Sequence, residues 1–238
     1  PGGWPQVSAV LAAMVNPRVD GAFLRLTVEE AGVTLAYAVL GTVTSLVLGA
    51  VGGLVLTERL WTPLAGPRRW RTGPWLGLRT LAAVPRSMHE VVFGLLLINI
   101  LGLDPLVAVL AIGLPYGAVT AKVFAELLDE SPVEAERSLR AAGASKITAL
   151  VFATVPHALG DLVSYSFYRF ECALRSAAVL GIVGAGGLGF QLALSFTSLR
   201  YEEMWTFLWA LIILSAGADR WSSLVRRRHR VAAAGSGA

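Results

Sequence analysis

The chain has 238 residues, of which 55% are hydrophobic and 15% are charged, and it carries a formal net charge of +4. Its mean hydropathy of +0.64 excludes an ordinary water-soluble domain and indicates a protein whose solvent is a lipid bilayer. The single cysteine, Cys172, excludes an internal disulfide and a cysteine metal cluster, and the three histidines are not at ligand spacing, so we expect no metal site. The basic residues are concentrated between apolar runs, which is typical of membrane topology and not of nucleic-acid binding.

Residues 1–30 mix apolar and charged side chains, and the apolar spacing predicts a short helix that lies on the membrane surface or packs on the bundle. Pro1 is not an initiator methionine, so we expect a processed or trimmed chain. Residues 31–56 carry no charge and, at about 1.5 Å per residue, can cross a hydrocarbon core of about 30 Å. The glycines of this first span predict a close approach of neighbouring helices.

Four further apolar segments complete a predicted all-α bundle of about five transmembrane helices, in a single transmembrane domain of residues 1–238. These segments are residues 75–101, 106–123, 156–182 and 204–218. Basic residues mark the cytoplasmic side of a membrane protein, and here they are Arg59, Arg68, Arg69, Arg71 and the arginines of the tail 219–238. With five spans, the N-terminus of the chain lies outside, the C-terminus lies in the cytoplasm, and the polar loop 122–156 also faces the cytoplasm.

The polar loop contains the signals of a short helix. Ser131 is predicted to cap its N-terminus, Pro132 to occupy the first helical position, and Glu134 to complete a capping box. Gly143 is predicted to end it. Such a helix has small residues on one side and charges on the other, and it suits docking into a cleft of another protein. The alternative is a solvated loop between two spans.

Two stretches carry a family resemblance. The order Glu134-Ala, then Gly143-Ala-Ser, then Pro156 thirteen residues after the glycine, resembles the coupling-loop signature of binding-protein-dependent ABC importer permeases. Residues 164–189, which include Tyr-Arg-Phe-Glu and Gly-Ala-Gly-Gly-Leu-Gly, resemble more narrowly the phosphonate-type permease family. The pattern Pro-Arg-Ser from residue 85 fits the same family, and the resemblance covers about residues 30–230.

The resemblance implies a type I ABC importer permease with a cytoplasmic coupling helix. It implies as partners a dimer of ATP-binding subunits, a second permease subunit that is identical or not, an extracytoplasmic solute-binding protein, membrane lipid and an anionic cargo. The cargo would be a phosphonate, phosphite or phosphate, and ATP and Mg would be held by the partner subunits, with no cofactor in this chain. The residues implied to contact the ATP-binding subunit are Glu134, Glu136, Arg137, Arg140, Ala141, Gly143 and Ala144.

One position departs from the family pattern. Family loops carry glutamate six residues before the glycine, and here that residue is Arg137. Glu136 lies one residue earlier, about 100° around a helix. We therefore expect either that Glu134 or Glu136 makes the contact instead, or that this chain pairs with a non-identical permease that keeps the standard loop.

Three charged residues and a glycine run are candidates for the translocation path or its gate. They are Arg169, Glu171, Arg175, Gly184, Gly186 and Gly187. A fourth span that starts near residue 158 would place Arg169 near mid-membrane, where a charge costs at least about 2.5–3.5 kcal/mol unless it is paired or faces water. Glu171 and Arg175 are spaced to pair along one helix. The alternative role for all three charges is structural pairing between spans.

The glycine run Gly-x-Gly-x-x-Gly also matches the dinucleotide-binding fingerprint. That fingerprint requires a βαβ unit with an acidic residue about twenty positions later, and the chain returns instead to an apolar span. We expect the glycines to allow a close helix crossing or a bend.

The sequence thus predicts a permease subunit without enzymatic activity of its own, because no Gly-x-x-x-x-Gly-Lys-Ser/Thr phosphate loop is present. The alternatives are a gradient-driven secondary transporter or channel, and a membrane-embedded enzyme, for which we find no clustered catalytic residues.

Overall fold

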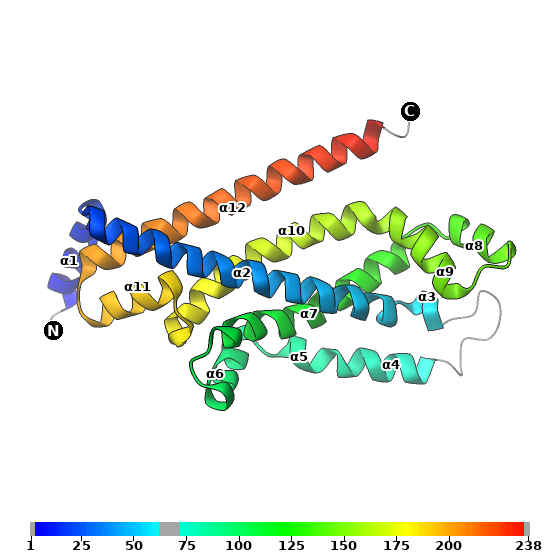
Figure 1. Cartoon of the computed structure of the whole chain (residues 1–238), viewed down its shortest axis with the longest axis horizontal. Coiled ribbons are helices and arrows are strands. Elements are labelled where there is room, and N and C mark those ends of the chain that lie inside the picture. Colours follow the sequence, from blue (N-terminus) through cyan, green and yellow to red (C-terminus); the bar gives the residue numbers. More distant parts are fainter. Residues whose placement is uncertain (1–2, 62–71, 236–238) are drawn as a thin grey trace. The chain divides into compact units, whose positions relative to one another are not determined.

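A computed structural model describes residues 3–61 and 72–235, and within the second range the side chains of residues 73–226. All regular elements of the described residues are helices, which confirms the all-α prediction (Figure 1). Their bounds are α1 Gly3–Val15, α2 Gly21–Leu56, α3 Glu58–Trp61, α4 Thr72–Leu81, α5 Ala83–Ser87, α6 Glu90–Leu101, α7 Pro105–Glu130, α8 Glu134–Ala141, α9 Lys146–Ala149, η2 Leu150–Thr154, α10 Val155–Leu180, η3 Gly181–Ala185, α11 Gly187–Thr197 and α12 Tyr201–Gly235.

Three helical runs of the described chain are long and apolar enough to cross a membrane. They are α2, α7 and the run Lys146–Ala185, which contains α9, η2, α10 and η3. The pair Gly73–Ser87 and Glu90–Leu101 would add a fourth if it is one broken span. Residues 204–218, the fifth predicted span, belong to α12, which does not meet the same criterion, so the count of five stays a prediction.

The span predicted for residues 75–101 is not one continuous helix, and its crossing of the membrane as one broken span stays a prediction. The helices on either side of Met88 and His89 meet at 82°, because Met88 takes an extended backbone conformation (φ −99°, ψ 137°) that ends α5. Arg68, Arg69 and Arg71, on which the predicted orientation also depends, lie outside the described residues.

The fourth span begins earlier than predicted. Ser145 caps α9, and its Oγ accepts a hydrogen bond from the backbone N–H of Thr148 (3.1 Å). The run continues through the π-helical segment η2, in which the N–H of Val155 donates to the carbonyl of Leu150. Pro156 follows directly and lacks the N–H that an α-helical turn would use, so the wider turn lets the helix pass this proline without a break.

The described helices group into two compact units, which we treat separately. The first comprises residues 1–41, 90–112 and 170–223, and the second residues 42–89, 113–169 and 224–238. The core of the first unit contains Phe23, Leu188 and Phe207, and the rings of Phe23 and Phe207 lie 5.0 Å apart. The core of the second contains Leu56, Ala121 and Ala125.

In the second unit, α2 and α7 approach each other closely. A Cβ atom added to Gly52 would lie 2.6 Å from the Cβ of Ala121, and one added to Gly53 would lie 2.7 Å from the Cβ of Phe124. Only glycine leaves room for this contact, which confirms the close approach predicted from the glycine-rich span.

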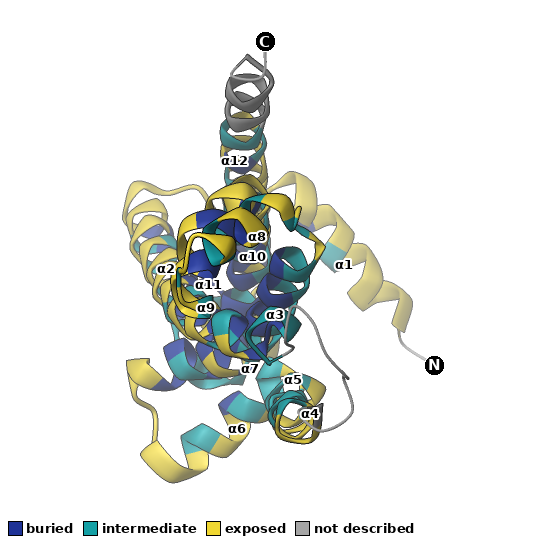
Figure 2. Cartoon of the chain, turned by 90° about the vertical axis from the view of Figure 1, so that its right-hand side faces the viewer, coloured by how far each residue is buried: buried dark blue, intermediate teal, exposed yellow. Residues whose placement is uncertain are grey.

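The segment 1–30 contains α1 and the first turns of α2. In the first unit, Trp205 of α12 donates from Nε1 to the carbonyl of Val10 (2.7 Å), so α1 packs on the bundle. Its other faces are exposed, and Trp4 retains 84% of its accessible surface (Figure 2).

The junction between α1 and α2 is held by charged groups. Asp20 accepts hydrogen bonds from Arg18 Nε (2.7 Å) and from the N–H of Phe23 (2.8 Å), and Arg18 Nη1 also donates to Glu203 (2.9 Å). The hydrogen bond from Arg18, and after it that from Phe23, lowers the pKa of Asp20 below its usual range. The same bond, followed by that to Glu203, raises the pKa of Arg18.

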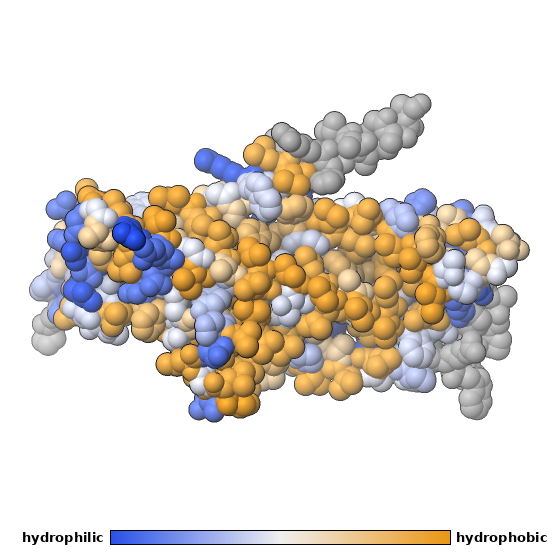
Figure 3. Space-filling view, viewed as in Figure 1, coloured by the Kyte–Doolittle hydropathy of each residue, from blue (hydrophilic) through white to orange (hydrophobic). Residues whose placement is uncertain are grey.

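Apolar side chains dominate the face seen in Figure 3. Only 33% of the most apolar window of α2 is buried, and Val43, Val47 and Val51 are each more than half exposed. Such a surface would be unfavourable in water and is the expected outer surface of a membrane helix.

Candidate functional site

The helix α8 forms in the polar loop, as predicted, but it begins differently. Val133 is its N-cap and makes no side-chain cap, so the predicted capping box does not form. Ser131, which directly follows α7, instead donates from Oγ back to the carbonyl of Leu127 in the last turn of that helix (3.0 Å). The acidic residues Glu134 and Glu136 in the first turn of α8 favour this helix N-terminus electrostatically.

The end of α8 is a Schellman motif. Gly143 has a φ of +91°, which favours glycine. Its N–H donates to the backbone carbonyl of Arg140 (3.1 Å), and the N–H of Ala144 donates to the backbone carbonyl of Leu139 (3.0 Å). Arg140 also donates from Nη1 to the carbonyl of Ala144 (3.1 Å), which fixes the chain beyond the helix.

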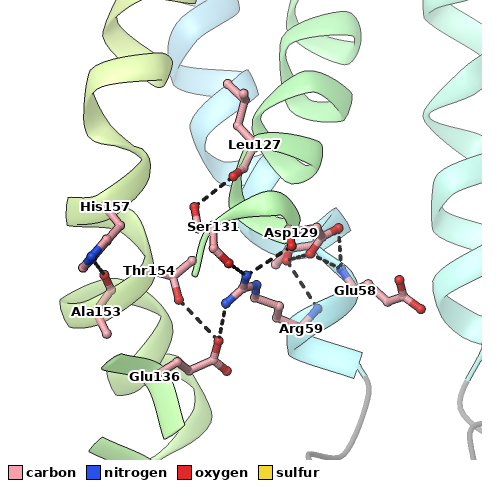
Figure 4. A network of polar contacts seen from close by, with 10 residues as sticks. Glu58, Arg59, Leu127, Asp129, Ser131, Glu136, Ala153, Thr154 and His157 are labelled. Carbon is pink, nitrogen blue, oxygen red and sulfur yellow. Dashed lines mark hydrogen bonds and ion pairs between the residues drawn. The ribbon is translucent and has the colours of Figure 1, made fainter. Parts of the chain in front are cut away.

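A buried ion pair joins α8 to the helix that follows α2. Arg59 Nη1 of α3 lies 2.7 Å from Glu136 Oε2, and the two side chains are only 9% and 8% exposed. Thr154 of η2 donates from Oγ1 to the same carboxylate oxygen (3.4 Å). Figure 4 shows Glu136 directed toward Arg59 and Thr154, so a glutamate of α8 fixes this helix to its own chain.

The same arginine reaches the end of α7. Arg59 Nη2 donates to the carbonyls of Asp129 (3.1 Å) and Ser131. The carboxylate of Asp129 in turn accepts from the N–H of Glu58 (3.0 and 3.1 Å) and from the hydroxyl of Thr57. These contacts, all within the second unit, tie the ends of α2 and α7 to the base of α8 (Figure 4).

The predicted coupling residues therefore lie on two sides of the segment. Glu136 is buried, while Arg140 and Ala144 are half-buried. The exposed positions are Glu134, Arg137, Ala141 and Gly143. Glu136 is turned inward toward Arg59, while Arg137, at the position where the family pattern has glutamate, is exposed. That Glu134 or Glu136 contacts the ATP-binding subunit stays a prediction.

Sequence reasoning missed Arg59 and Asp129. Arg59 was assigned to the positive loop after the first span, and no spacing signal links it to Glu136, which follows 77 residues later. The contact of Arg59 with Glu136 depends on how α3 and α8 pack against each other, which the sequence does not show.

Arg169 lies in an aromatic environment within the second unit. It is 7% exposed, and its guanidinium carbon lies 4.0 Å from the ring centroid of Tyr116 and 5.7 Å from that of Tyr165. A desolvated cation–π contact contributes about 2 kcal/mol, which offsets only part of the cost of a buried charge. The predicted mid-membrane depth of Arg169 rested on a helix start near residue 158 and is not supported, because the run begins at Lys146.

The other two charged candidates belong to the first unit. Arg175 pairs with Asp219 of α12 (3.6 Å), and its predicted pair with Glu171 stays a prediction. Glu171 is buried at 9% exposure. Nearby on the same helix, Ser176 donates from Oγ to Glu90 Oε1 (2.6 Å), which links α10 to the start of α6.

The glycine run breaks the helix between η3 and α11. Gly184, Gly186 and Gly187 all have positive φ values, of +110°, +93° and +76°. A Cβ on Gly187 would lie 2.5 Å from Thr34 Oγ1, and this hydroxyl accepts a hydrogen bond from the N–H of Leu188 (2.9 Å). No strand precedes the run among the described residues, so the dinucleotide fingerprint is absent and the predicted bend is confirmed.

Comparison with known proteins identifies the family. Residues 64–228 match the family described as the binding-protein-dependent transport system inner membrane component. The chain is 29% identical over 233 residues to the phosphite transport system permease protein PtxC of Stutzerimonas stutzeri, covering 96% of this chain and 79% of that protein. It is also 29% identical over 226 residues to the phosphate-import permease protein PhnE of Mycolicibacterium smegmatis, covering 94% of this chain and 40% of that longer protein.

The fold is that of ABC importer permeases. The inward-facing MetNI methionine ABC transporter superposes with a TM-score of 0.74 at 19% identity, covering 89% of this chain and 99% of the transporter chain. With its apolar helices, the chain is a multi-pass membrane protein. It belongs to the family of binding-protein-dependent transport system inner membrane components, the permease subunits of ATP-driven importers.

Proposed function

We propose that this chain forms the membrane path of an importer whose cargo is a phosphorus oxyanion, namely a phosphonate, phosphite or phosphate. The relatives at 29% identity are named for phosphite and phosphate transport. The described chain also carries a buried arginine, Arg169, whose contacts are aromatic, and such a group suits an anionic cargo better than a neutral or cationic one.

The exposed side of α8 docks into a cleft of an ATP-binding subunit. The observation that carries this proposal is the anchoring of α8: a buried ion pair fixes its inner side, while Glu134, Arg137 and Ala141 remain exposed. A helix held in this way transmits a push from outside to the end of α7, which Arg59 contacts, and to α3, which contains Arg59 and directly follows α2. ATP and Mg belong to the partner, and hydrolysis there drives alternating access here.

The complex contains two ATP-binding subunits, a second permease and an extracytoplasmic solute-binding protein. Arg137 occupies the position at which the family pattern has glutamate, so the contact of this chain with its ATP-binding subunit differs in charge from the standard one. This difference supports a pair of non-identical permeases. In the assembled transporter the N-terminus of this chain lies outside, and α8 and the basic C-terminal tail lie in the cytoplasm.

Uptake in cells tests the function directly. A strain that lacks other phosphorus importers is supplied with this permease, its ATP-binding subunit, its second permease and its binding protein. Growth on phosphite or methylphosphonate as the sole phosphorus source is expected, and it is expected to stop when the ATP-binding subunit is inactivated. Uptake that continues without the ATP-binding subunit and collapses with a protonophore would support a gradient-driven transporter instead.

A further inference from the structure

Arg169 combines deep burial with a fixed orientation. Its 7% exposure is close to that of Arg59, whose side chain is 9% exposed and whose charge is matched by Glu136. The guanidinium of Arg169 instead lies over the ring of Tyr116 and near that of Tyr165. Tyr165 is itself packed against Phe124 (centroids 6.0 Å apart), so the aromatic side chains hold the cation in place.

The stacking leaves the donors of this arginine available. A guanidinium stacks through its flat face, whereas its five N–H donors lie in the plane and point outward from the edge. The Nε of Arg169 is buried and has no hydrogen-bond partner among the described residues. The two aromatic rings therefore stabilise the positive charge without supplying an oxygen acceptor for this donor.

An oxyanion completes this environment. The planar fork of a guanidinium matches two oxygens of a tetrahedral phosphorus centre through two parallel, charge-assisted hydrogen bonds. Arg175, by comparison, has a side chain that is 60% exposed and paired with Asp219. It therefore does not offer a buried N–H donor without a partner, as Arg169 does.

We propose that Arg169, positioned by Tyr116 and Tyr165, is a binding residue for the phosphorus oxyanion inside the permease. This inference rests on the cargo class proposed above and adds the group that recognises it. The phosphate of a lipid headgroup presents the same oxygens, so the experiment must separate a free oxyanion from a lipid.

The experiment measures thermal unfolding of the whole transporter complex, purified in phosphate-free maltoside detergent, at increasing concentrations of methylphosphonate. Four complexes are compared: wild type, Arg169→Met, Arg169→Lys and Arg25→Met. The last is a matched control, because Arg25 on α2 makes only an exposed pair with Glu29. A parallel series adds phosphatidylglycerol without methylphosphonate. The partner subunits are identical throughout, so binding at their sites cancels between variants.

Methylphosphonate is expected to raise the unfolding temperature of wild type and of Arg25→Met by about 2–4 °C at several times its Kd. Arg169→Met should show no such rise. Arg169→Lys keeps the charge but loses the two-pronged contact, and it should need at least about tenfold more methylphosphonate for the same rise. The lysine variant keeps the test decisive if the methionine variant assembles poorly.

Three results would overturn the inference. Arg169→Lys and Arg169→Met could respond to methylphosphonate as wild type does. Wild type could fail to respond at all. Phosphatidylglycerol alone could reproduce the Arg169-dependent rise while methylphosphonate does not, which would make a lipid headgroup the ligand. If cells still import methylphosphonate in any of these cases, the proposed cargo stands and only the role of Arg169 falls.

Discussion

Arg59 Nη1 and Glu136 Oε2 lie 2.7 Å apart inside the second unit, where they join α3 to the first turn of α8. The pair joins two segments that are 77 residues apart in sequence. It turns a glutamate of α8 inward, toward its own chain. The exposed residues of α8 and the buried glutamate that fixes it to α3 are thus different residues, so their roles can be tested separately.

Removing one member of this pair should destabilise the complex strongly. Arg59→Met leaves the Glu136 carboxylate buried without its counter-ion. We expect this to lower the free energy of unfolding by about 3–5 kcal/mol. Thermal unfolding of the purified complex measures the loss. The control is Arg25→Met, whose exposed ion pair should contribute less than about 1 kcal/mol.

The double variant of Arg59→Met with Glu136→Met sharpens this test, because no buried charge remains unpaired. It should lose clearly less stability than the sum of the two single variants. Additive losses would show that the two side chains do not interact.

Gly143→Val should uncouple ATP hydrolysis from uptake. The space around a Cβ at this position is open, so the effect arises from the backbone, whose φ of +91° is unfavourable for a β-branched residue. The strain of about 1–3 kcal/mol is expected to open the Schellman turn that fixes the end of α8. The ratio of cargo transported to ATP hydrolysed, measured in liposomes, should fall.

Gly143→Asn is the matched control, since asparagine tolerates the left-handed conformation better than other residues with a side chain. It should retain most of the coupling. A normal transport ratio in Gly143→Val would count against the role of α8.

The turn after the glycine run depends on one hydroxyl group. Thr34 Oγ1 accepts the buried N–H of Leu188, and Thr34→Val keeps the shape while removing this acceptor. We expect the free energy of unfolding to fall by about 1–3 kcal/mol, because the buried N–H of Leu188 is left without an acceptor. Thr34→Ser, which keeps the oxygen, should lose much less. Equal losses in thermal unfolding would assign the effect to the methyl group and not to the hydrogen bond.

The junction between α1 and α2 should loosen in acid. Arg18 lowers the pKa of Asp20, so the carboxylate binds fewer protons in the folded state than in the unfolded state. The stability that the ionised Asp20 carboxylate adds to the folded state is therefore fully present above the unfolded pKa of about 3.9. It is lost as the pH falls through the lower, folded pKa. Hydrogen exchange at the N–H of Phe23 should remain slow from pH 7 to about 5 and accelerate below about 4, after correction for the intrinsic rate.

Asp20→Asn should remove that pH dependence, since asparagine caps a helix without titrating. A variant that still loosens over the same range would place the titrating group elsewhere.

Much of the fold could be predicted from local signals. Long uncharged runs predict membrane helices whatever their neighbours, and the glycines of α2 predict the close contact with α7 that Gly52 makes. Gly143 ends α8 as predicted, because the left-handed turn is a requirement of the local backbone.

The errors arose where a residue had two possible partners. Ser131 can cap the next helix or bond back to the preceding turn, and only the length of α7 decides for the second. The contact of Arg175 with Asp219 of α12 is not signalled by the spacing along its own helix. The contact between Arg59 and Glu136 depends on how separate helices meet, which no sequence spacing encodes.

The π-helical turn Leu150–Thr154 has a consequence for mutational scanning of this segment. A π turn holds one residue more than an α turn, which shifts the angular phase of the following residues by about 100°. A helical wheel drawn through residues 146–185 with one period will therefore misassign faces beyond Val155. Deleting a single residue in the widened turn would restore regular α-helical hydrogen bonding, in which the missing N–H of Pro156 would leave a gap. It would also rotate α9 and the residues before it about the helix axis relative to α10.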